Sequence, residues 1–426
     1  MLTVVFTVLA AVTLLPALLG VFGRRVLSRR QRRRLASQRA AQDAGGMWAR
    51  WAGTVQRRPA VLAAAATAVM IVLAIPVLSL RLGSSDQGND RSSSTTRQAY
   101  DLLAKGFGPG FNGPLLLVAQ TNSPTDAAAL RTLQDRLPQV AGVASVRVLA
   151  GAHGAEVIQV TPGTSPEAQA TSHLITTLRD HVIPAAEHGT TLRVYVGGLT
   201  ATFADFATVV TGKLPWFILT IVGRSFLLLV VAFRSLLIPA TAAVMNLLAA
   251  AAAFGVVVAI FQFGWGLRLL NLGQAGPVES FLPVLMLSVL FGLSMDYEVF
   301  LVSRIREEWG ITGSNQRAVR AGQATTGRVI VAAATIMICV FSAFILTGQQ
   351  VIGEFGIGLA IAVLLDAFIL RTILVPALMH LFGRANWWLP GWLGRSLPHI
   401  SIEPAAELPA PLGPPRASEP AVPVAR

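Results

Sequence analysis

Three adjacent polar residues interrupt an apolar run that is long enough to cross a membrane. The run opens near Phe281, and its central part reads FGLSMDYEVFLVSRIREEW over residues 291–309. This places Asp296, Tyr297 and Glu298 within the hydrocarbon. A charged side chain at that depth costs about 2.5 to 3.5 kcal/mol on insertion scales, so a carboxylate there predicts ion or proton handling.

The predicted chemistry is reversible proton binding by Asp296 with Tyr297 as its partner. Burial favours the neutral form of a carboxyl group, and a tyrosine hydroxyl can donate to the carboxylate or pass the proton on. The alternative is an aspartate that only ties helices together through hydrogen bonds. Glu298 lies two residues further on, hence on a different helix face nearer the inner surface, where it either takes part in the relay or caps a solvated face.

Two other apolar segments carry charged residues whose roles stay open. Asp366 and Arg371 are five residues apart, which does not align them on an α-helix, so we expect each to need a partner on another span, in a structural or a functional ion pair. Arg224 stands too deep in its segment to snorkel comfortably. It is interpreted as a partner for Asp296 or Asp366, as a residue facing a water-filled groove, or as damage in a copy free of functional constraint.

The sequence predicts no metal site and no cofactor. The six histidines show no ligand spacing, and no phosphate-binding glycine loop with a lysine occurs. Cys339 is the single cysteine, which excludes a disulfide within the chain and a cysteine metal cluster.

Composition identifies a membrane protein. Of the 426 residues, 53% are apolar and only 13% are charged, which is too hydrophobic for a soluble enzyme of this length. The formal charge of +13 comes almost entirely from arginine. These arginines gather between apolar segments, a pattern that favours a positive-inside bias over nucleic-acid binding.

Hydropathy predicts about seven membrane spans, with every arginine-rich loop on the same side. The first span is followed rather than preceded by arginines, unlike a signal peptide. We expect a basic cytoplasmic linker over 23–60, a five-helix bundle over 214–382, an inner loop over 304–328 and a disordered cytoplasmic tail over 383–426. The predicted spans are Met1–Phe22, Val61–Leu80, Leu214–Phe233, Leu237–Phe261, the segment from Phe281 to about Trp309, Val329–Leu346 and Phe355–Leu381.

The polar stretch 81–213 predicts an α+β domain on the opposite side of the membrane from the linker. Its order of strands and helices is βαββαβ, which is the ferredoxin-like split arrangement, a fold that many functions share. The predicted strands are Pro114–Gln120, Val143–Leu149, Glu156–Thr161 and Leu192–Val196, and the predicted helices are Asp126–Leu137 and Pro166–Asp180.

Two segments far apart in the chain resemble each other. LLPALLGVFGRR over 14–25 matches LVPALMHLFGRA over 374–385, with shared prolines, phenylalanines and glycines at the same spacing. We interpret the first segment as the last helix of an earlier copy of a membrane repeat, so that the chain would begin one helix before its second copy. The alternative is convergence of two basic-ended helices.

The chain resembles the second half of the MMPL transporters of the resistance-nodulation-division superfamily. The resemblance rests on the segment 291–309, on AFRS over 232–235, AAVMNLL over 242–248 and FGWG over 263–266, and on the closing stretch LLDAFILRTILVPALMHLFGRANWWLP. Full-length members look like twelve-span proteins with two extracytoplasmic porter domains, and this chain corresponds to span six onward.

The resemblance implies proton-driven export of lipids or other amphiphilic molecules across a bacterial plasma membrane. It implies an Asp-Tyr pair on span four, in the half not matched here, and a second on span ten, at Asp296 and Tyr297. Expected partners are membrane lipid, a hydrophobic or amphiphilic substrate, and either a chain supplying the first half or a second copy. Alternatives are a non-transporting scaffold or regulator, a relic, and a half-size accessory subunit like those of protein translocation.

Overall fold

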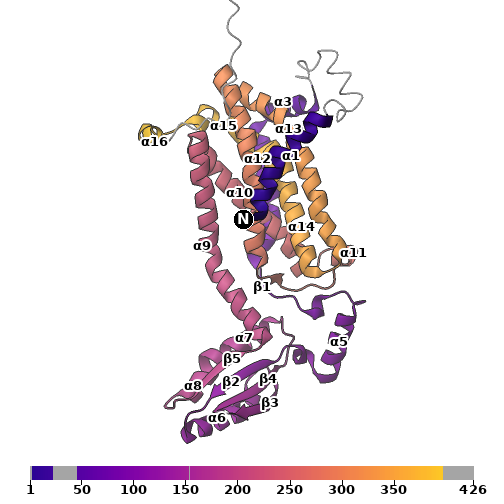
Figure 1. The fold of residues 1–426 in the computed structure, drawn as a ribbon, viewed down its shortest axis with the longest axis vertical. Coiled ribbons are helices and arrows are strands. Elements are labelled where there is room, and N and C mark those ends of the chain that lie inside the picture. Colours follow the sequence, from indigo (N-terminus) through magenta and orange to yellow (C-terminus); the bar gives the residue numbers. More distant parts are fainter. Residues whose placement is uncertain (1, 23–45, 153, 397–426) are drawn as a thin grey trace, which may run out of the picture.

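The computed structural model describes residues 2–22, 46–152 and 154–396, which form a helical bundle and a separate α+β domain (Figure 1). The arginine run 29–34 and the tail beyond 396 lie outside the described residues. Seven helices in the described part are long and apolar enough to span a membrane, as predicted. They are α1 (Leu2–Phe22), α4 (Pro59–Ala74, continued to Ser79), α9 (Leu199–Phe233), α10 (Leu237–Val257, continued to Gln262), α12 (Leu282–Thr312), α13 (Asn315–Ala343, continued to Thr347), and α14 (Gln350–Leu364) with its continuation through Leu365–Leu374 into α15 (Val375–Phe382).

Helices extend well beyond the apolar segments that predicted them. The predicted inner loop 304–328 is wrong, because α12 continues to Thr312, α13 begins at Asn315, and only a short turn with Gly313 at φ 62° separates them. Helix α9 likewise begins at Leu199 rather than Leu214. Hydropathy marks where a helix enters hydrocarbon, whereas backbone hydrogen bonding continues into water when polar side chains support it.

Part of the predicted basic linker is a packed helix. Helix α3 (Met47–Arg57) turns Ala49, Ala52 and Val55 inward and packs along α13. The indole of Trp48 lies where a Cβ at Gly327 of α13 would stand, so a side chain at that glycine would clash with the ring. This segment therefore belongs to the bundle instead of lying loosely at the lipid surface.

The α+β domain contains a four-stranded antiparallel sheet in the order β3-β4-β2-β5. Burial alternates along β2, which turns Leu115, Leu117 and Ala119 into the core. Helices α6 and α7 pack on that face, giving a core that includes Leu133 and Leu178. The elements are β2 (Leu115–Gln120), α6 (Pro124–Arg136), β3 (Val143–Ala152), β4 (Ala155–Pro162), α7 (Gln169–Thr177), α8 (Ile183–Glu187) and β5 (Arg193–Gly197).

Two connections join the α+β domain to the bundle. Strand β1 (Leu82–Gly83), which follows α4, pairs in parallel with β6 (Val278–Glu279), which precedes α12. Helix α9 runs from the sheet domain along the side of the bundle as one continuous rod (Figure 1). The α+β domain is thus continuous with α9 and is hydrogen-bonded to the segment that leads into α12.

Candidate functional site

The bundle interior contains an arginine held between two carboxylates. Arg371 is 1% exposed, Glu298 and Asp366 are each 2% exposed, and the three come from α12 and from the segment after α14. The guanidinium pairs with Glu298 through Nη1, and its Nη2 lies 3.3 Å from Oδ1 of Asp366. The structure thus brings together two residues that the sequence ranked below Asp296.

A π-helix produces the contact between Asp366 and Arg371. Both lie in the segment Leu365–Leu374, which is a π-helix. Its hydrogen bonds join residues five apart, so side chains at that spacing share a face. The prediction that the spacing of five separates Asp366 from Arg371 was wrong because it assumed α-helical geometry.

Side chains from two other helices hold the end of this π-helix. The carbonyl oxygen of Thr372 accepts hydrogen bonds from Nε2 of Gln323 on α13, at 2.8 Å, and from Nε1 of Trp51 on α3, at 3.0 Å. A buried carbonyl needs such donors. The uncommon helical geometry is therefore supported by tertiary contacts.

Ser294 connects the charged groups to α10. Its hydroxyl oxygen lies 2.7 Å from Oδ1 of Asn246 and 3.0 Å from Oδ1 of Asp366, and its carbonyl accepts from Nη2 of Arg371 at 2.6 Å. A serine has one hydroxyl hydrogen, which cannot serve two acceptors. The second contact requires a proton on Asp366 or the opposite orientation of the Asn246 amide. Ser294 was not among the residues that the sequence pattern singled out, although it stands four residues before Glu298 and so on the same helix face.

The charge cluster, defined as Glu298, Asp366 and Arg371, carries a formal charge of −1 when both carboxylates are ionised. An excess charge in a dry interior is expensive, and buried carboxylates relieve it by binding protons. One added proton makes the cluster neutral.

Asp296 and Tyr297 do not enter the charge cluster. Asp296 is exposed on the bundle surface within this chain, and the half-buried Tyr297 places its hydroxyl 3.3 Å from Sδ of Met337 on α13. Ser294 and Glu298 face the core, and a residue midway between them points to the opposite side of an α-helix. The expected burial of Asp296 is thus not found in this chain, and the roles of both residues stay predictions.

Arg224 also lies on the surface, on α9. Asp366 takes Arg371 as its partner, so the interpretation of Arg224 as the counterion of Asp366 is wrong.

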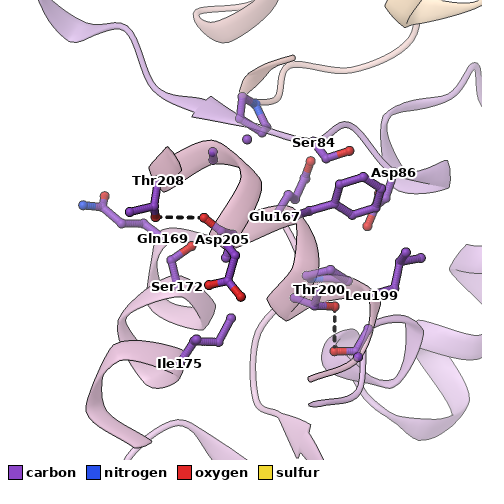
Figure 2. Close-up of a pocket in the computed structure, with 18 of the residues that line it drawn as sticks. Ser84, Asp86, Glu167, Gln169, Ser172, Ile175, Leu199, Thr200, Asp205 and Thr208 are labelled. Carbon is purple, nitrogen blue, oxygen red and sulfur yellow. Dashed lines mark hydrogen bonds between the residues drawn. The ribbon is translucent and has the colours of Figure 1, made fainter. Parts of the chain in front are cut away.

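A large cavity lies between the α+β domain, α9 and the β1 segment. Its volume is about 1050 Å³. Figure 2 shows Glu167 and Asp86 on one side and Leu199, Thr200, Asp205 and Thr208 on α9. The lining combines apolar with charged side chains: Leu116, Ile175, Leu199 and Phe203 on the one hand, and Arg81, Asp86, Glu167, Arg179 and Asp205 on the other.

The charged walls of the cavity differ in character. Burial raises the pKa of the Asp86 carboxyl group. Burial also raises the pKa of Glu167, and the negative charge of Asp86 raises it further. Across the cavity, Nη2 of Arg179 lies 2.9 Å from Oδ2 of Asp205 on α9. One wall thus carries carboxyl groups whose pKa is raised, and the other carries a salt bridge that links the α+β domain to α9.

The model of the MMPL family matches residues 1–62 and 120–400 of this chain. Among similar proteins, the membrane protein YdfJ of Bacillus subtilis is 36% identical over 407 residues, which are 94% of this chain and 54% of YdfJ. The heme uptake protein MmpL11 of Mycobacterium tuberculosis (strain H37Rv) is 35% identical over 409 residues, 94% of this chain and 42% of that protein.

The mycolic acid-containing lipids exporter MmpL11 of Mycolicibacterium smegmatis is 34% identical over 410 residues, 94% of this chain and 43% of that protein. The chain thus spans about half the length of the curated relatives it matches. The matched residues include the helices that build the charge cluster, and the match extends over most of the chain. We conclude that this chain belongs to the MMPL family.

Proposed function

We propose that this chain is part of a proton-driven transporter that exports lipids or other hydrophobic and amphiphilic molecules across a bacterial plasma membrane. The observation that carries the proposal is the charge cluster, whose formal charge of −1 changes to zero when one proton binds. A buried group that switches between these states can bias a two-state motion of the helices around it.

The coupling element in this proposal is the continuous helix formed by α14, the π-helix and α15. It carries Asp366 and Arg371, while α12 carries Glu298 inside and Asp296 on its surface. Protons would reach the cluster along α12, with Asp296 and Tyr297 as the relay. Protonation would weaken the hold of the carboxylates on Arg371 and let the two helices shift.

We assign the α+β domain as an extracytoplasmic porter domain of the ferredoxin-like type. Its βαββαβ order and its antiparallel sheet support this assignment. The cavity beside it has walls suited to both ends of an amphiphile, because apolar side chains can hold a chain and charged ones a head group. The relatives' names include heme and mycolic acid-containing lipids, which are cargoes of this broad class.

We also propose that helices from another chain, or from a second copy, cover the surface that carries Asp296 and Arg224. Both residues lie mid-span and are exposed in this chain. Ionisable residues at such depth almost always face protein or water rather than lipid. The competing function is a non-transporting scaffold. A buried excess charge would destabilise the fold of such a scaffold without contributing to its role.

Proton flux into vesicles that contain the full chain tests the function. We expect Glu298→Gln and Asp366→Asn each to abolish flux driven by an imposed pH gradient, because each removes the group that changes charge. Glu307→Gln is the matched control, since it makes the same change at a half-exposed position of α12. Flux equal to wild type in both cluster variants, or no flux in the wild type, would favour the scaffold.

A further inference from the structure

A second set of buried carboxyl groups lies at the end of the bundle next to the α+β domain. Glu354 of α14 is 0% exposed, and its Oε2 accepts a hydrogen bond from the backbone NH of Glu279 at 3.2 Å. Its Oε1 has no hydrogen-bond partner among the described residues. Gln350, one turn earlier, donates through Nε2 to the carbonyl of Gln274 at 3.2 Å and leaves its own buried Oε1 equally unpaired.

Both unpaired atoms are acceptors, so this site lacks a donor. Leaving a buried acceptor unsatisfied costs about 1 to 3 kcal/mol. Gln350 and Glu354 stand four residues apart on one helix and interact with each other. A neutral carboxyl group at Glu354 would carry a hydrogen that it could donate to the amide oxygen of Gln350, and one proton would then supply a donor for both unpaired atoms.

Glu279 brings a second carboxyl group to the same place. It is buried, and its Oε1 accepts from the backbone NH of Ser85 at 2.8 Å. Burial raises the pKa of Glu279, against the opposing hydrogen bonds from Ser85 and Ser84. No arginine or lysine in the described part of the chain forms an ion pair with either glutamate. The guanidinium of Arg91 lies instead against Gly348, in the turn before α14.

Glu279 lies beside the cavity, and Glu354 lies on the helix that leads to the charge cluster. Ser84, Ser85 and Pro277 line the cavity, so Glu279 lies directly behind its wall. Glu279 is also part of β6, which pairs with β1. On the other side, Glu354 shares its continuous helix with Asp366, about 18 Å further along the axis.

We propose that Glu354 and Glu279 form a proton-binding site that exchanges protons with the cavity. In this site Glu354 holds the proton between itself and Gln350, and Glu279 is the neighbouring carboxyl group that controls how tightly the proton is held. Loss of the proton leaves two adjacent carboxylates repelling each other across the contact between β6 and α14. The site therefore joins proton release to the connection between the α+β domain and the helix that carries the cluster.

Infrared difference spectroscopy of the full chain in lipid nanodiscs, titrated with acid and base, tests this site directly. We expect wild type to show the carbonyl band of a neutral carboxyl group that persists well above the pH at which exposed glutamates ionise. Glu354→Gln should remove the contribution of Glu354 to this band while keeping the fold, because glutamine is isosteric and neutral. Glu307→Gln, at a half-exposed position, should retain it.

Two further measurements make the outcome decisive. Glu279→Gln removes a negative neighbour and should lower the titration midpoint of the band by about one pH unit. The Glu354 contribution, taken as the difference between each background and the same background carrying Glu354→Gln, should be the same with and without Asp366→Asn, so the site can be established even if transport through the charge cluster fails. The proposal is overturned if Glu354→Gln leaves the amplitude of the band unchanged. It is also overturned if the midpoint falls when sodium replaces choline at constant ionic strength, since that would indicate a metal cation in place of the proton.

Discussion

At the scale of single residues, the charge cluster has one carboxylate more than its guanidinium requires. Arg371 contacts Glu298 and Asp366 at once, and either of them suffices to balance its charge. A structural ion pair would need only one partner. The surplus carboxylate is the chemical feature on which the proposed proton binding rests.

This surplus predicts unequal effects of single and double substitutions. Glu298→Gln and Asp366→Asn should each fold, because each leaves one guanidinium and one carboxylate. The double variant leaves Arg371 buried without a counterion and should lose about 3 to 5 kcal/mol of stability. Thermal unfolding of the detergent-solubilised full chain measures this difference. Additive effects of the two single changes would contradict the shared role of Arg371.

Asp126 in the α+β domain is a buried carboxylate whose ionised form is stabilised by hydrogen bonds. Burial alone would raise its pKa, but hydrogen bonds from the backbone NH of Asn122, from the side chain and NH of Thr191 and from Ser123 lower the pKa to about 2. A lowered pKa in the folded state means that the ionised form stabilises the fold above the unfolded pKa of about 3.9. That contribution is lost as the pH falls through about 2.

We therefore expect the α+β domain to lose protection against hydrogen exchange between about pH 4 and about pH 2. Peptides from β5 and from the start of α6 should open first, because Asp126 joins these elements. In the Asp126→Asn variant, the amide hydrogens of these peptides should be less protected than in wild type at pH 5. Their protection should also fall less than in wild type as the pH is lowered through the acid range. Exchange followed by mass spectrometry on the full chain, corrected for intrinsic rates, gives the comparison. Equal acid sensitivity in the variant would assign the transition to other groups.

At the scale of elements, the π-helix decides which side chains meet. Its geometry places Asp366 and Arg371 on one face, and its Thr372 carbonyl is held by donors from α3 and α13. The amphipathic helix α3 thereby reaches the functional part of the bundle from a segment that the sequence presented only as a basic linker.

The two donors to Thr372 predict a non-additive pair of substitutions. Gln323→Leu removes one hydrogen bond but also removes the unpaired Oε1 of that glutamine, so the loss should stay below about 1 kcal/mol. Trp51→Phe leaves the bond from Gln323 in place. The double variant leaves the carbonyl unpaired and should cost about 1 to 3 kcal/mol beyond the sum of the single changes. A double-mutant cycle on unfolding temperature tests this, and additivity would show that water replaces both donors.

At the scale of the whole molecule, α9 is the element that links the cavity beside the α+β domain to the helical bundle. It lines the cavity with residues from Leu199 to Gly212 and then continues along the side of the bundle. In the proposed function, the cavity at one end of α9 and the charge cluster inside the bundle that α9 packs against would form the basis for coupling. Binding in the cavity and protonation in the bundle would then influence each other reciprocally.

Filling the cavity should weaken binding of an amphiphile without affecting the bundle. Ala207→Trp places a large ring into the cavity from α9, whereas Val209→Trp adds the same ring at an exposed position that does not line it. We expect at least a tenfold weaker affinity for a fluorescent fatty acid in the first variant and an unchanged affinity in the second. Fluorescence titration of the solubilised full chain provides the measurement. Equal binding by both variants would exclude this cavity as the site of binding.

The amino-acid sequence by itself determined the number of membrane spans, the presence of a polar α+β domain between the second and third, and the presence of ionisable groups in the hydrocarbon. These follow from hydropathy and local periodicity, which are properties of short stretches of chain. Glu298 and Asp366 could also be recognised as unusual, because any carboxylate in an apolar span is costly.

Only the tertiary structure decided which of these groups meet. The surface position of Asp296, the pairing of Asp366 with Arg371, and the approach of Glu279 to Glu354 depend on how helices rotate and pack, and in one case on a π-helix supported by neighbouring helices. A local pattern carries no information on such contacts, because residues more than seventy positions apart, such as Glu298 and Arg371, become neighbours only when the bundle assembles.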